Sequence, residues 1–361
     1  MKKIVFILNN IDHPTCKKRI NEFKEHEYAV EVYGFSRYEY NLSTRDSNEY
    51  NILGSIHNKK YFLRIFFMFT SIRRLLKAKK NEDFLLYFFG LDIAILASLM
   101  TSHKYIFEEM DLVHTYIKNK IIRTSMEKID KYIIFHSFQT VLTSEGFAKF
   151  HFGNIIPGNI SIIPNRLSPS ILQFPFSTMK STNISALKIG FVGGIRFKSI
   201  LFFAEYFVKN YPNNEFHFYG NQQPSVVKKC AELNHYSNCY FHGPFKNPND
   251  LPSIYSNIDL VLSTYDTEFE NVKYAEPNKI YESIYFETPI IVSSGTFLSE
   301  KVKLLDIGYV IDPLNQTSIN DFIEKLSIKD IQQKIANEAK IPKSYCINSN
   351  DHLFKKLKQE L

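Results

Sequence analysis

The sequence predicts an α/β protein with two doubly wound domains that face a cleft. Strand-like and helix-like segments alternate along most of the chain, which is typical of parallel sheets covered by helices. The 361 residues exceed one ordinary core and suit two domains of roughly 150–180 residues. A stretch rich in Ser and Pro at 167–185 shows little periodicity and separates two series of segments.

Apolar runs predict strands in both halves, and helical periodicity predicts the helices between them. In the first half, strands are expected at 4–8, 30–35, 84–89, 105–107, 133–135, 141–142 and 160–163. Helices are expected there at 60–80, 91–100, 114–130 and 145–151. In the second half, strands are expected at 187–192, 215–219, 240–241, 260–262, 290–292 and 309–311. The last helices are expected at 319–339 and 350–361.

These segments predict four parts of the chain. The parts are an N-terminal domain at 1–170, a linker at 171–185, a C-terminal domain at 186–341 and a closing segment at 342–361. Residues 1–8 are short, lead into two asparagines and lack a small-residue cleavage site, so they are interpreted as a first strand and not a signal peptide.

The positive charge of the chain is unevenly placed. The net charge is +7. Residues 1–180 hold 25 basic and 17 acidic side chains, net +8, and the remainder holds 19 and 20, net −1. Residues 59–80 alone hold eight basic side chains and no acid. Uniform basicity would indicate nucleic acid, whereas one basic segment indicates a docking edge, so no nucleic-acid partner is expected.

Residues 61–76 can be drawn as a basic helix with an aromatic and aliphatic face (Phe62, Ile65, Phe66, Phe69 and Ile72). Such a helix suits an anionic membrane surface. The alternative is a helix that packs on the core and whose lysines are simply solvated. Both interpretations stay open.

No apolar run reaches the roughly 18–20 residues that a membrane-spanning helix needs. The four cysteines show no paired metal-ligand spacing, so reduced, structural thiols in a cytosolic protein are expected. They are Cys16, Cys230, Cys239 and Cys346. Residues 266–268, Asp-Thr-Glu, match a metal-binding Asp-x-Asp pattern only loosely, and no metal is expected.

Residues 274–295 are the most informative stretch of the chain. Pro277 and Asn278 predict a helix start, with Asn278 as N-cap. Lys279, Glu282 and Ser283 then share one face beside the helix N-terminus. Free amides and a lysine there suit a diphosphate, and a carboxylate one turn on suits a ribose diol. The stretch therefore predicts a nucleotide diphosphate site, with an exposed Lys279–Glu282 ion pair as the plainer alternative.

The turn at 193–196, Gly-Gly-Ile-Arg, follows an apolar strand. Gly193 and Gly194 let the backbone approach a ligand closely, and Arg196 adds a positive charge. Combined with the 278–282 pattern, the turn predicts phosphate binding. The alternative is a tight strand–helix turn whose arginine pairs locally.

Three carboxylates close the predicted strand at 105–107. Asp111, and after it Glu109, are candidates for a general base or a ligand of the substrate that it deprotonates. The alternative is a solvated acidic turn before the helix at 114–130.

The sequence at 277–283, Pro-Asn-Lys-Ile-Tyr-Glu-Ser, followed by Pro-Ile-Ile at 289–291, resembles the donor-site motif of GT-B nucleotide-sugar glycosyltransferases. The nearest resemblance is to the capsule and exopolysaccharide branch of glycosyltransferase family 4. Residues 162–165, 188–196, 215–220 and 240–245 extend it along most of the chain. The chain departs from the family at Tyr274, where a glutamate often stands eight residues before Glu282.

The resemblance implies two Rossmann-like domains, the first for the acceptor and the second for the donor, with 342–361 crossing back to the first. It implies that Arg196 and Lys279 contact the donor diphosphate, that Glu282 holds the ribose, and that His13 and Arg19 border the acceptor. The expected catalytic residues are Asp111, Glu109, Arg196 and Lys279. The expected donor residues are Gly193, Gly194, Arg196, Lys198, Gly220, Gly243, Pro244, Phe245, Asn278, Lys279, Glu282 and Ser283.

The implied function is transfer of a hexose from a nucleotide diphosphate-sugar to a polysaccharide or lipid-linked acceptor. The setting would be capsule, exopolysaccharide or O-antigen synthesis, in the cytoplasm or at the inner face of the cytoplasmic membrane. Neither a metal nor another cofactor is expected. The alternatives are a nucleotide-sugar epimerase of the same architecture and a non-catalytic binding partner with this fold.

Overall fold

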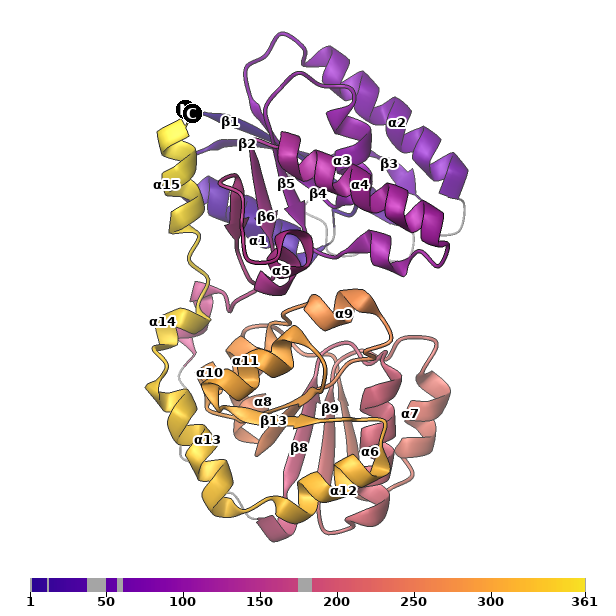
Figure 1. Ribbon diagram of the computed structural model, residues 1–361, viewed down its shortest axis with the longest axis vertical. Coiled ribbons are helices and arrows are strands. Elements are labelled where there is room, and N and C mark those ends of the chain that lie inside the picture. Colours follow the sequence, from indigo (N-terminus) through magenta and orange to yellow (C-terminus); the bar gives the residue numbers. More distant parts are fainter. Residues whose placement is uncertain (1, 12, 38–49, 57–60, 175–183, 361) are drawn as a thin grey trace. The chain divides into compact units, whose positions relative to one another are not determined.

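The computed structural model describes residues 2–11, 13–37, 50–56, 61–174 and 184–360. The chain forms two compact units: unit 1 is Met1–Ile163 with Ser349–Leu361, and unit 2 is Pro164–Asn348. Each unit holds one parallel sheet flanked by helices (Figure 1). The predicted class, α/β with two Rossmann-like doubly wound domains, is confirmed.

In unit 1 the sheet has the order β3-β2-β1-β4-β5-β6-β7. The strand order reverses between β1 and β4, and in such sheets ligands bind beyond the carboxyl ends of the strands near that point. The strands are β1 (Lys3–Leu8), β2 (Ala29–Arg37), β3 (Asn51–Ile56), β4 (Leu85–Phe89), β5 (Tyr105–Glu109), β6 (Gln139–Leu142) and β7 (Ile160–Ile162). The helices are α1 (Pro14–Glu25), α2 (Tyr61–Ala78), α3 (Leu91–Ser98), the 3-10 helix η1 (Val113–Tyr116), α4 (Lys120–His136), α5 (Glu145–Phe152) and α15 (Asp351–Glu360).

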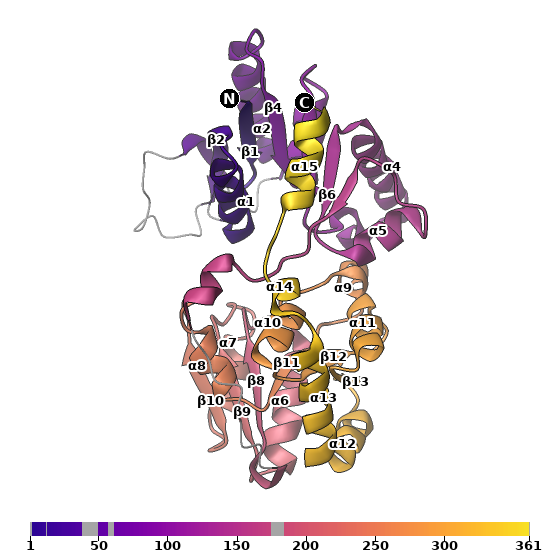
Figure 2. The same ribbon diagram turned by 90° about the vertical axis from the view of Figure 1, so that its left-hand side faces the viewer.

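Aromatic side chains fill much of the unit 1 core. The rings of Phe6 on β1 and Tyr87 on β4 stack at 4.8 Å. The ring of Phe354 on α15 packs 4.8 Å from Phe23, so the last helix completes this core (Figures 1 and 2).

In unit 2 the sheet has the order β10-β9-β8-β11-β12-β13, and the order reverses between β8 and β11. The strands are β8 (Lys188–Val192), β9 (Glu215–Tyr219), β10 (Cys239–Gly243), β11 (Leu260–Ser263), β12 (Ile290–Ser293) and β13 (Gly308–Ile311). The helices are the 3-10 helices η2 (Pro169–Gln173) and η3 (Ile184–Ala186), then α6 (Lys198–Asn210), α7 (Val227–Leu233), α8 (Leu251–Ser256), α9 (Glu270–Tyr274), α10 (Lys279–Phe286), α11 (Phe297–Leu305), α12 (Gln316–Lys325), α13 (Ile328–Lys340) and α14 (Lys343–Cys346).

Successive side chains of these strands enter two different clusters. Because side chains alternate along a strand, Phe191 packs with the cluster that α6 covers, and Val192 with the cluster that α8 and α10 cover. A sheet buried on both faces explains why its strands are continuous apolar runs.

Three predicted segments differ from the structure, and one strand was not predicted. The helix predicted at 114–130 is the 3-10 helix η1 followed by α4, and the helix predicted at 319–339 is two helices, α12 and α13. The strand predicted at 133–135 is the last turn of α4, where Ile133 and Ile134 are buried and Phe135 is exposed. An apolar run of three residues does not distinguish a strand from a buried helical turn. The edge strand β3 was not predicted because its side chains are largely exposed and lack a strong apolar pattern.

The unit boundaries also differ from the expected ones. The chain leaves unit 1 at Ile163, ahead of the expected linker at 171–185, of which 175–183 lies outside the described residues. Leu167 and Ile171 are buried in unit 2, and the Leu167 amide donates to the Cys346 carbonyl at 2.9 Å. Of the closing segment, residues up to Asn348 belong to unit 2 and only the rest to unit 1.

All four cysteines are free and buried. Among the described residues, none of the helices combines the length and apolar character needed to cross a bilayer.

Candidate functional site

Three glycines lie at the carboxyl edge of the unit 2 sheet, where β8, β9 and β10 end. The Gly193 amide donates to the Tyr219 carbonyl at 2.8 Å, and the Gly220 amide donates to the Gly243 carbonyl at 2.7 Å. All three glycines have positive φ, namely +149°, +139° and +76° in chain order. A Cβ on Gly220 would lie 1.9 Å from the Gly193 carbonyl oxygen. The glycines therefore let the backbones of three loops pack closely together. The surface formed by Gly193, Gly220 and Gly243 is called the glycine ledge.

Lys279 and Glu282 form a buried ion pair on α10. The Lys279 ammonium lies 3.0 and 2.8 Å from the two carboxylate oxygens of Glu282, which is 0% exposed. Tyr255 donates its hydroxyl to the same carboxylate at 2.6 Å, and Asn278 donates its side-chain amide at 2.7 Å. The pair is thus an interior network and not an exposed helix contact.

The predicted N-cap position of Asn278 is confirmed, but a side-chain cap is not formed there. Asn278 occupies the N-cap position in helical conformation, but its side chain makes no capping hydrogen bond. Its amide turns instead toward Glu282, four residues on, because that buried carboxylate requires donors.

The ion pair lies beside the glycine ledge. The Cβ position of Gly193 is 3.8 Å from the Cε of Lys279. Gly193 follows β8, which adjoins the point where the strand order reverses. Ligands of doubly wound sheets bind beyond strand ends at this position. The structure therefore brings together the two sequence motifs, 193–196 and 278–282, at the expected ligand edge.

Arg196 and Lys198 are exposed at the start of α6. The Arg196 guanidinium lies 4.7 Å from the ring centre of Phe197, whose ring packs 4.9 Å from that of Tyr265. Asp266 accepts the backbone amides of Lys198 and Ser199 at 3.1 and 2.8 Å. Asp266, part of the loose metal pattern, therefore caps this helix.

Ser283 turns away from the expected ligand. Its hydroxyl donates to Glu338 on α13 at 2.5 Å, and the residue is fully buried. Ser283 thus joins α10 to α13, which contradicts its expected place among the donor residues. Pro244 is exposed, and Phe245 is half-buried against the cluster under α8 and α10.

The sequence did not indicate two tyrosines of this site. Tyr255 lies on α8 and reaches Glu282 only through the fold, 27 residues along the chain. Burial, and next the Glu282 charge, raise the pKa of the Tyr255 hydroxyl, so it stays a donor. Tyr265 follows β11, and its amide donates to the Ser293 hydroxyl at 2.9 Å. No local spacing could have revealed either contact.

Glu276, two residues after Tyr274, contacts other side chains of unit 2. Its carboxylate is buried and paired with Lys301 at 2.6 Å, and it accepts the Tyr281 hydroxyl. It therefore serves the packing of α10 against α11.

In unit 1, the two candidate carboxylates after β5 have different surroundings. Asp111 is exposed. Glu109 is 1% exposed and lies 2.8 Å from the Nε2 of His151. Burial, and then the charge of Asp130, raise the pKa of Glu109, while burial lowers the pKa of His151 to about 4. Of the two, Asp111 is the one that solvent reaches.

Arg19 is a structural residue and not a surface contact for an acceptor. It is buried, and its Nε and Nη2 donate to the two Glu108 oxygens at 3.0 and 3.2 Å. A third bond runs from Nη1 to Glu22 at 2.6 Å. This bidentate arrangement contradicts the expected acceptor role. His13 is half-buried at the N-cap position of α1.

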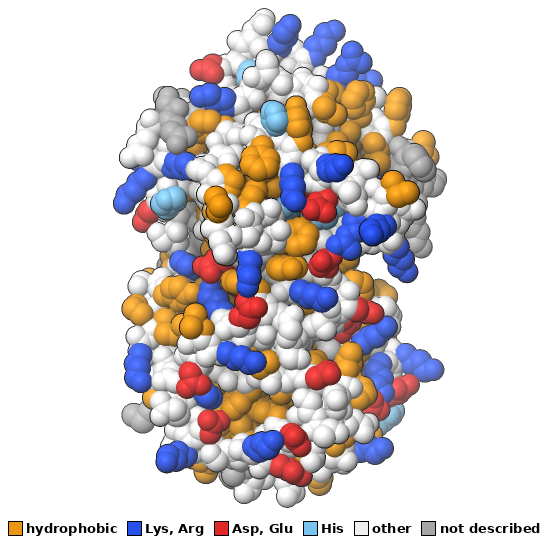
Figure 3. Space-filling model, in the orientation of Figure 1, with side chains coloured by type: hydrophobic (Ala, Val, Ile, Leu, Met, Phe, Trp, Pro, Cys, Tyr) orange, Lys and Arg blue, Asp and Glu red, His pale blue; other side chains and the backbone are white. Residues whose placement is uncertain are grey.

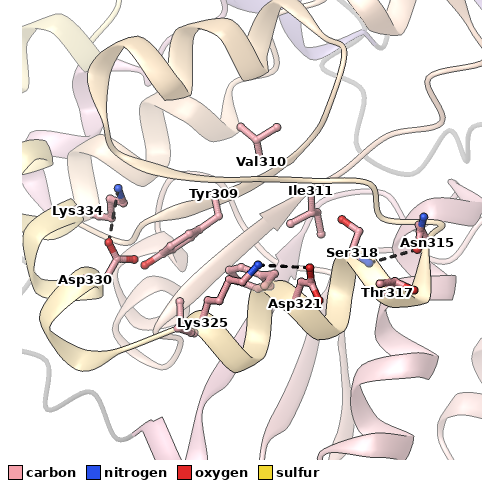
Figure 4. A pocket seen from close by; sticks show the side chains of 12 residues that line it. Tyr309, Val310, Ile311, Asn315, Thr317, Ser318, Asp321, Lys325, Asp330 and Lys334 are labelled. Carbon is pink, nitrogen blue, oxygen red and sulfur yellow. Dashed lines mark hydrogen bonds and ion pairs between the residues drawn. The ribbon is translucent and has the colours of Figure 1, made fainter.

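A surface hollow of about 640 Å³ lies elsewhere in unit 2, between β13, α12 and α13 (Figure 4). Tyr309 and two ion pairs, Asp321–Lys325 and Asp330–Lys334, line it. None of the residues expected at the donor is among its lining residues. The hollow is therefore separate from the candidate site.

The fold and this edge of unit 2 define a GT-B type protein. Residues 188–341 match the family described as "Glycosyl transferases group 1".

Solved structures show that the two-domain fold is shared with other proteins. One is sucrose-phosphate synthase from Thermosynechococcus elongatus, at 12% identity, with TM-score 0.70 and 100% of both chains covered. Another is Anabaena Alr3699/HepE in complex with UDP and glucose, at 13% identity, with TM-score 0.70 and 100% of both chains covered. A third is WaaG, a glycosyltransferase involved in lipopolysaccharide biosynthesis, at 14% identity, with TM-score 0.65 and 95% of both chains covered. No curated protein sequence matches the chain significantly.

Proposed function

We propose that this chain transfers a sugar from a nucleotide diphosphate-sugar to a saccharide acceptor. The observation that carries the proposal is the buried Lys279–Glu282 pair beside the glycine ledge, inside the group 1 domain. The complexes of Anabaena HepE with UDP and with UDP-glucose support a nucleotide-sugar donor.

The chemistry of the site follows from the charge on the leaving group, the nucleotide diphosphate. When the glycosidic bond breaks, negative charge develops on the departing diphosphate. Lys279, Arg196 and amides of the glycine ledge stabilise that charge, which is the main electrostatic contribution such a site makes. The carboxylate of Glu282 accepts the ribose hydroxyls, and the diphosphate draws the ammonium of Lys279 away from it.

On the acceptor side, Asp111 is the exposed carboxylate that follows β5. Asp111 acts as the general base if the transfer inverts configuration. The acceptor is a polysaccharide or lipid-linked saccharide of capsule, exopolysaccharide or O-antigen type, handled at the cytoplasmic face. Protein charges take the place of a metal at the diphosphate.

The function is tested by incubating the purified chain with a panel of UDP-, GDP- and other nucleotide sugars, with and without extracted acceptor. The proposal expects free nucleotide diphosphate whose release rises with acceptor. An epimerised nucleotide sugar without release would identify an epimerase instead. Binding without turnover under every condition would identify a non-catalytic partner.

Arg196→Ala is expected to weaken UDP binding about 10-fold to 30-fold, as loss of a charge-assisted hydrogen bond does. The melting temperature should stay unchanged because the side chain is exposed. Lys209→Ala, at the exposed far end of the same helix, is the matched control and should bind UDP normally. Unchanged affinity in Arg196→Ala would show that this arginine serves the local turn and does not contact the nucleotide.

We also propose that unit 1 docks on an anionic membrane through α2 and the helices beside it. Residues 59 and 60 of the basic segment lie outside the described residues. The helix α2 buries Met68 and Ile72 in unit 1, but Leu63 and Phe66 remain 66% and 69% exposed. Hydrophobic side chains gather over α2, α3 and α4 on the side seen in Figure 3. Exposed Arg73, Arg74, Lys77 and Lys80 supply positive charge, whereas Lys79 is buried in an ion pair with Glu31 at 2.7 Å.

The docking proposal is tested with the double change Leu63→Ser and Phe66→Ser. It should lower co-sedimentation with phosphatidylglycerol vesicles about 10-fold or more, since two large apolar side chains leave the interface. Leu304→Ser removes a leucine of unit 2 that is 85% exposed and should have no effect. Equal sedimentation with zwitterionic vesicles, or no loss in the double variant, would overturn this docking surface.

A further inference from the structure

Four polar side chains meet inside unit 1, away from the surface. They come from four different elements: Glu109 from β5, His114 from η1, Asp130 from α4 and His151 from α5. Glu109, His114 and Asp130 are each at most 1% exposed, and the His151 side chain is 0% exposed. Such a cluster is unusual because buried charges are normally paired with opposite charges or bound to metals.

The geometry brings ligand-type atoms together. One oxygen of Glu109, one nitrogen of His114 and one oxygen of Asp130 all lie within 4.8 Å of one another. The Nδ1 of His114 is 3.2 Å from Asp130, and the Nε2 of His151 is 2.8 Å from Glu109. Among the described residues, Glu109 Oε1, Asp130 Oδ1 and His114 Nε2 have no hydrogen-bond partner.

Within the described part of the chain, neither carboxylate of this cluster forms an ion pair with a lysine or arginine. Glu109 and Asp130 lie near each other and near the two imidazoles. Desolvation of an unpaired carboxylate costs several kcal/mol, and two adjacent carboxylates add repulsion. A divalent cation would neutralise both and use the unpaired atoms.

We propose that Glu109, His114 and Asp130 bind one divalent transition-metal ion, with zinc as the best fit. His151 orients Glu109 through a hydrogen bond to its carboxylate. One imidazole and two carboxylates form an N,O ligand set that zinc accepts. A hydrogen bond from a second residue to a ligand is the usual support of such sites. This metal site is separate from the donor residues, all of which lie in unit 2.

The position gives the ion a structural task. Glu109 and His114 flank the short turn at 110–113, which carries the exposed Asp111. Asp130 and His151 anchor α4 and α5 to the same point. The ion would thereby fix the turn that presents Asp111.

The test uses the full chain, purified, stripped with a chelator and dialysed against zinc. Inductively coupled plasma mass spectrometry should find about one tightly bound zinc ion per chain. Zinc should also raise the melting temperature of the protein. Cobalt(II) in place of zinc should give visible d–d absorption with nitrogen and oxygen ligands.

Asp130→Asn keeps the shape of the side chain but removes a ligand charge, and should lose the bound zinc. His136→Gln, an exposed histidine on the same helix, and Cys230→Ser, one of the buried thiols, should keep it. A wild-type chain that takes up neither zinc nor cobalt overturns the proposal, as does Asp130→Asn with full zinc content. Because the readout is metal content, it is independent of glycosyl transfer.

Discussion

Lys279→Met is expected to lower the free energy of unfolding of unit 2 by about 3 kcal/mol. The change leaves the Glu282 carboxylate fully buried without its counter-ion, and breaking a buried pair from one side is strongly destabilising. Glu282→Gln should destabilise for the same reason, because Lys279 is then the unpaired charge. The chain has no tryptophan, so urea unfolding is best followed by circular dichroism.

The double variant Lys279→Met with Glu282→Gln separates pairing from packing. Its loss of stability should be well below the sum of the two single losses, since neither charge is left alone. The pair Lys229–Glu232 has the same i,i+3 spacing, lies on the surface at 3.4 Å and is the matched control. Removal of Lys229 should cost only a few tenths of a kcal/mol. Equal effects at both pairs would mean that the α10 pair is a surface contact after all.

Gly220→Ala is expected to destabilise unit 2 by about 3 kcal/mol and to abolish UDP binding. The residue has φ +139°, which side chains rarely adopt, and its Cβ would meet the Gly193 carbonyl oxygen at 1.9 Å. Because backbone atoms form the obstacle, no rotamer change relieves it. The two loops must separate, and the ledge beside Lys279 changes shape.

Gly194→Ala is the control for Gly220→Ala in the same set of loops. A Cβ there meets nothing within 4 Å, and no unusual φ is required. Its stability should change by less than about 0.5 kcal/mol. If Gly220→Ala melted like Gly194→Ala and still bound UDP, the ledge would not be a rigid element of the site.

The sequence predicted the fold well where signals are local. The strands β8, β11 and β12 are buried on both faces, so they appear as apolar runs, and glycines follow β8 and β9. The 278–282 and 193–196 motifs were each visible in the sequence. The two motifs lie close together beside β8 because of the strand order. That order is consistent with the alternation of strands and helices in the sequence.

The sequence could not reveal contacts made between distant segments. Arg19 has the charge and the position expected of a ligand-binding residue. Its guanidinium is instead paired with Glu108, which lies on a strand far along the chain. Ser283 shares the helix turn with Glu282, yet Glu338 draws its hydroxyl toward α13. The cluster of Glu109, His114, Asp130 and His151 has no motif spacing because each side chain comes from a separate element.

The most direct test of the central claim is titration calorimetry of the wild-type chain with UDP, GDP, ADP and CMP. The account predicts saturable binding of at least one pyrophosphate nucleotide, weakened in Arg196→Ala and lost in the folded double variant at Lys279 and Glu282. A chain that gives no heat with any pyrophosphate nucleotide at millimolar concentration would contradict the account. So would a double variant that binds as tightly as the wild type.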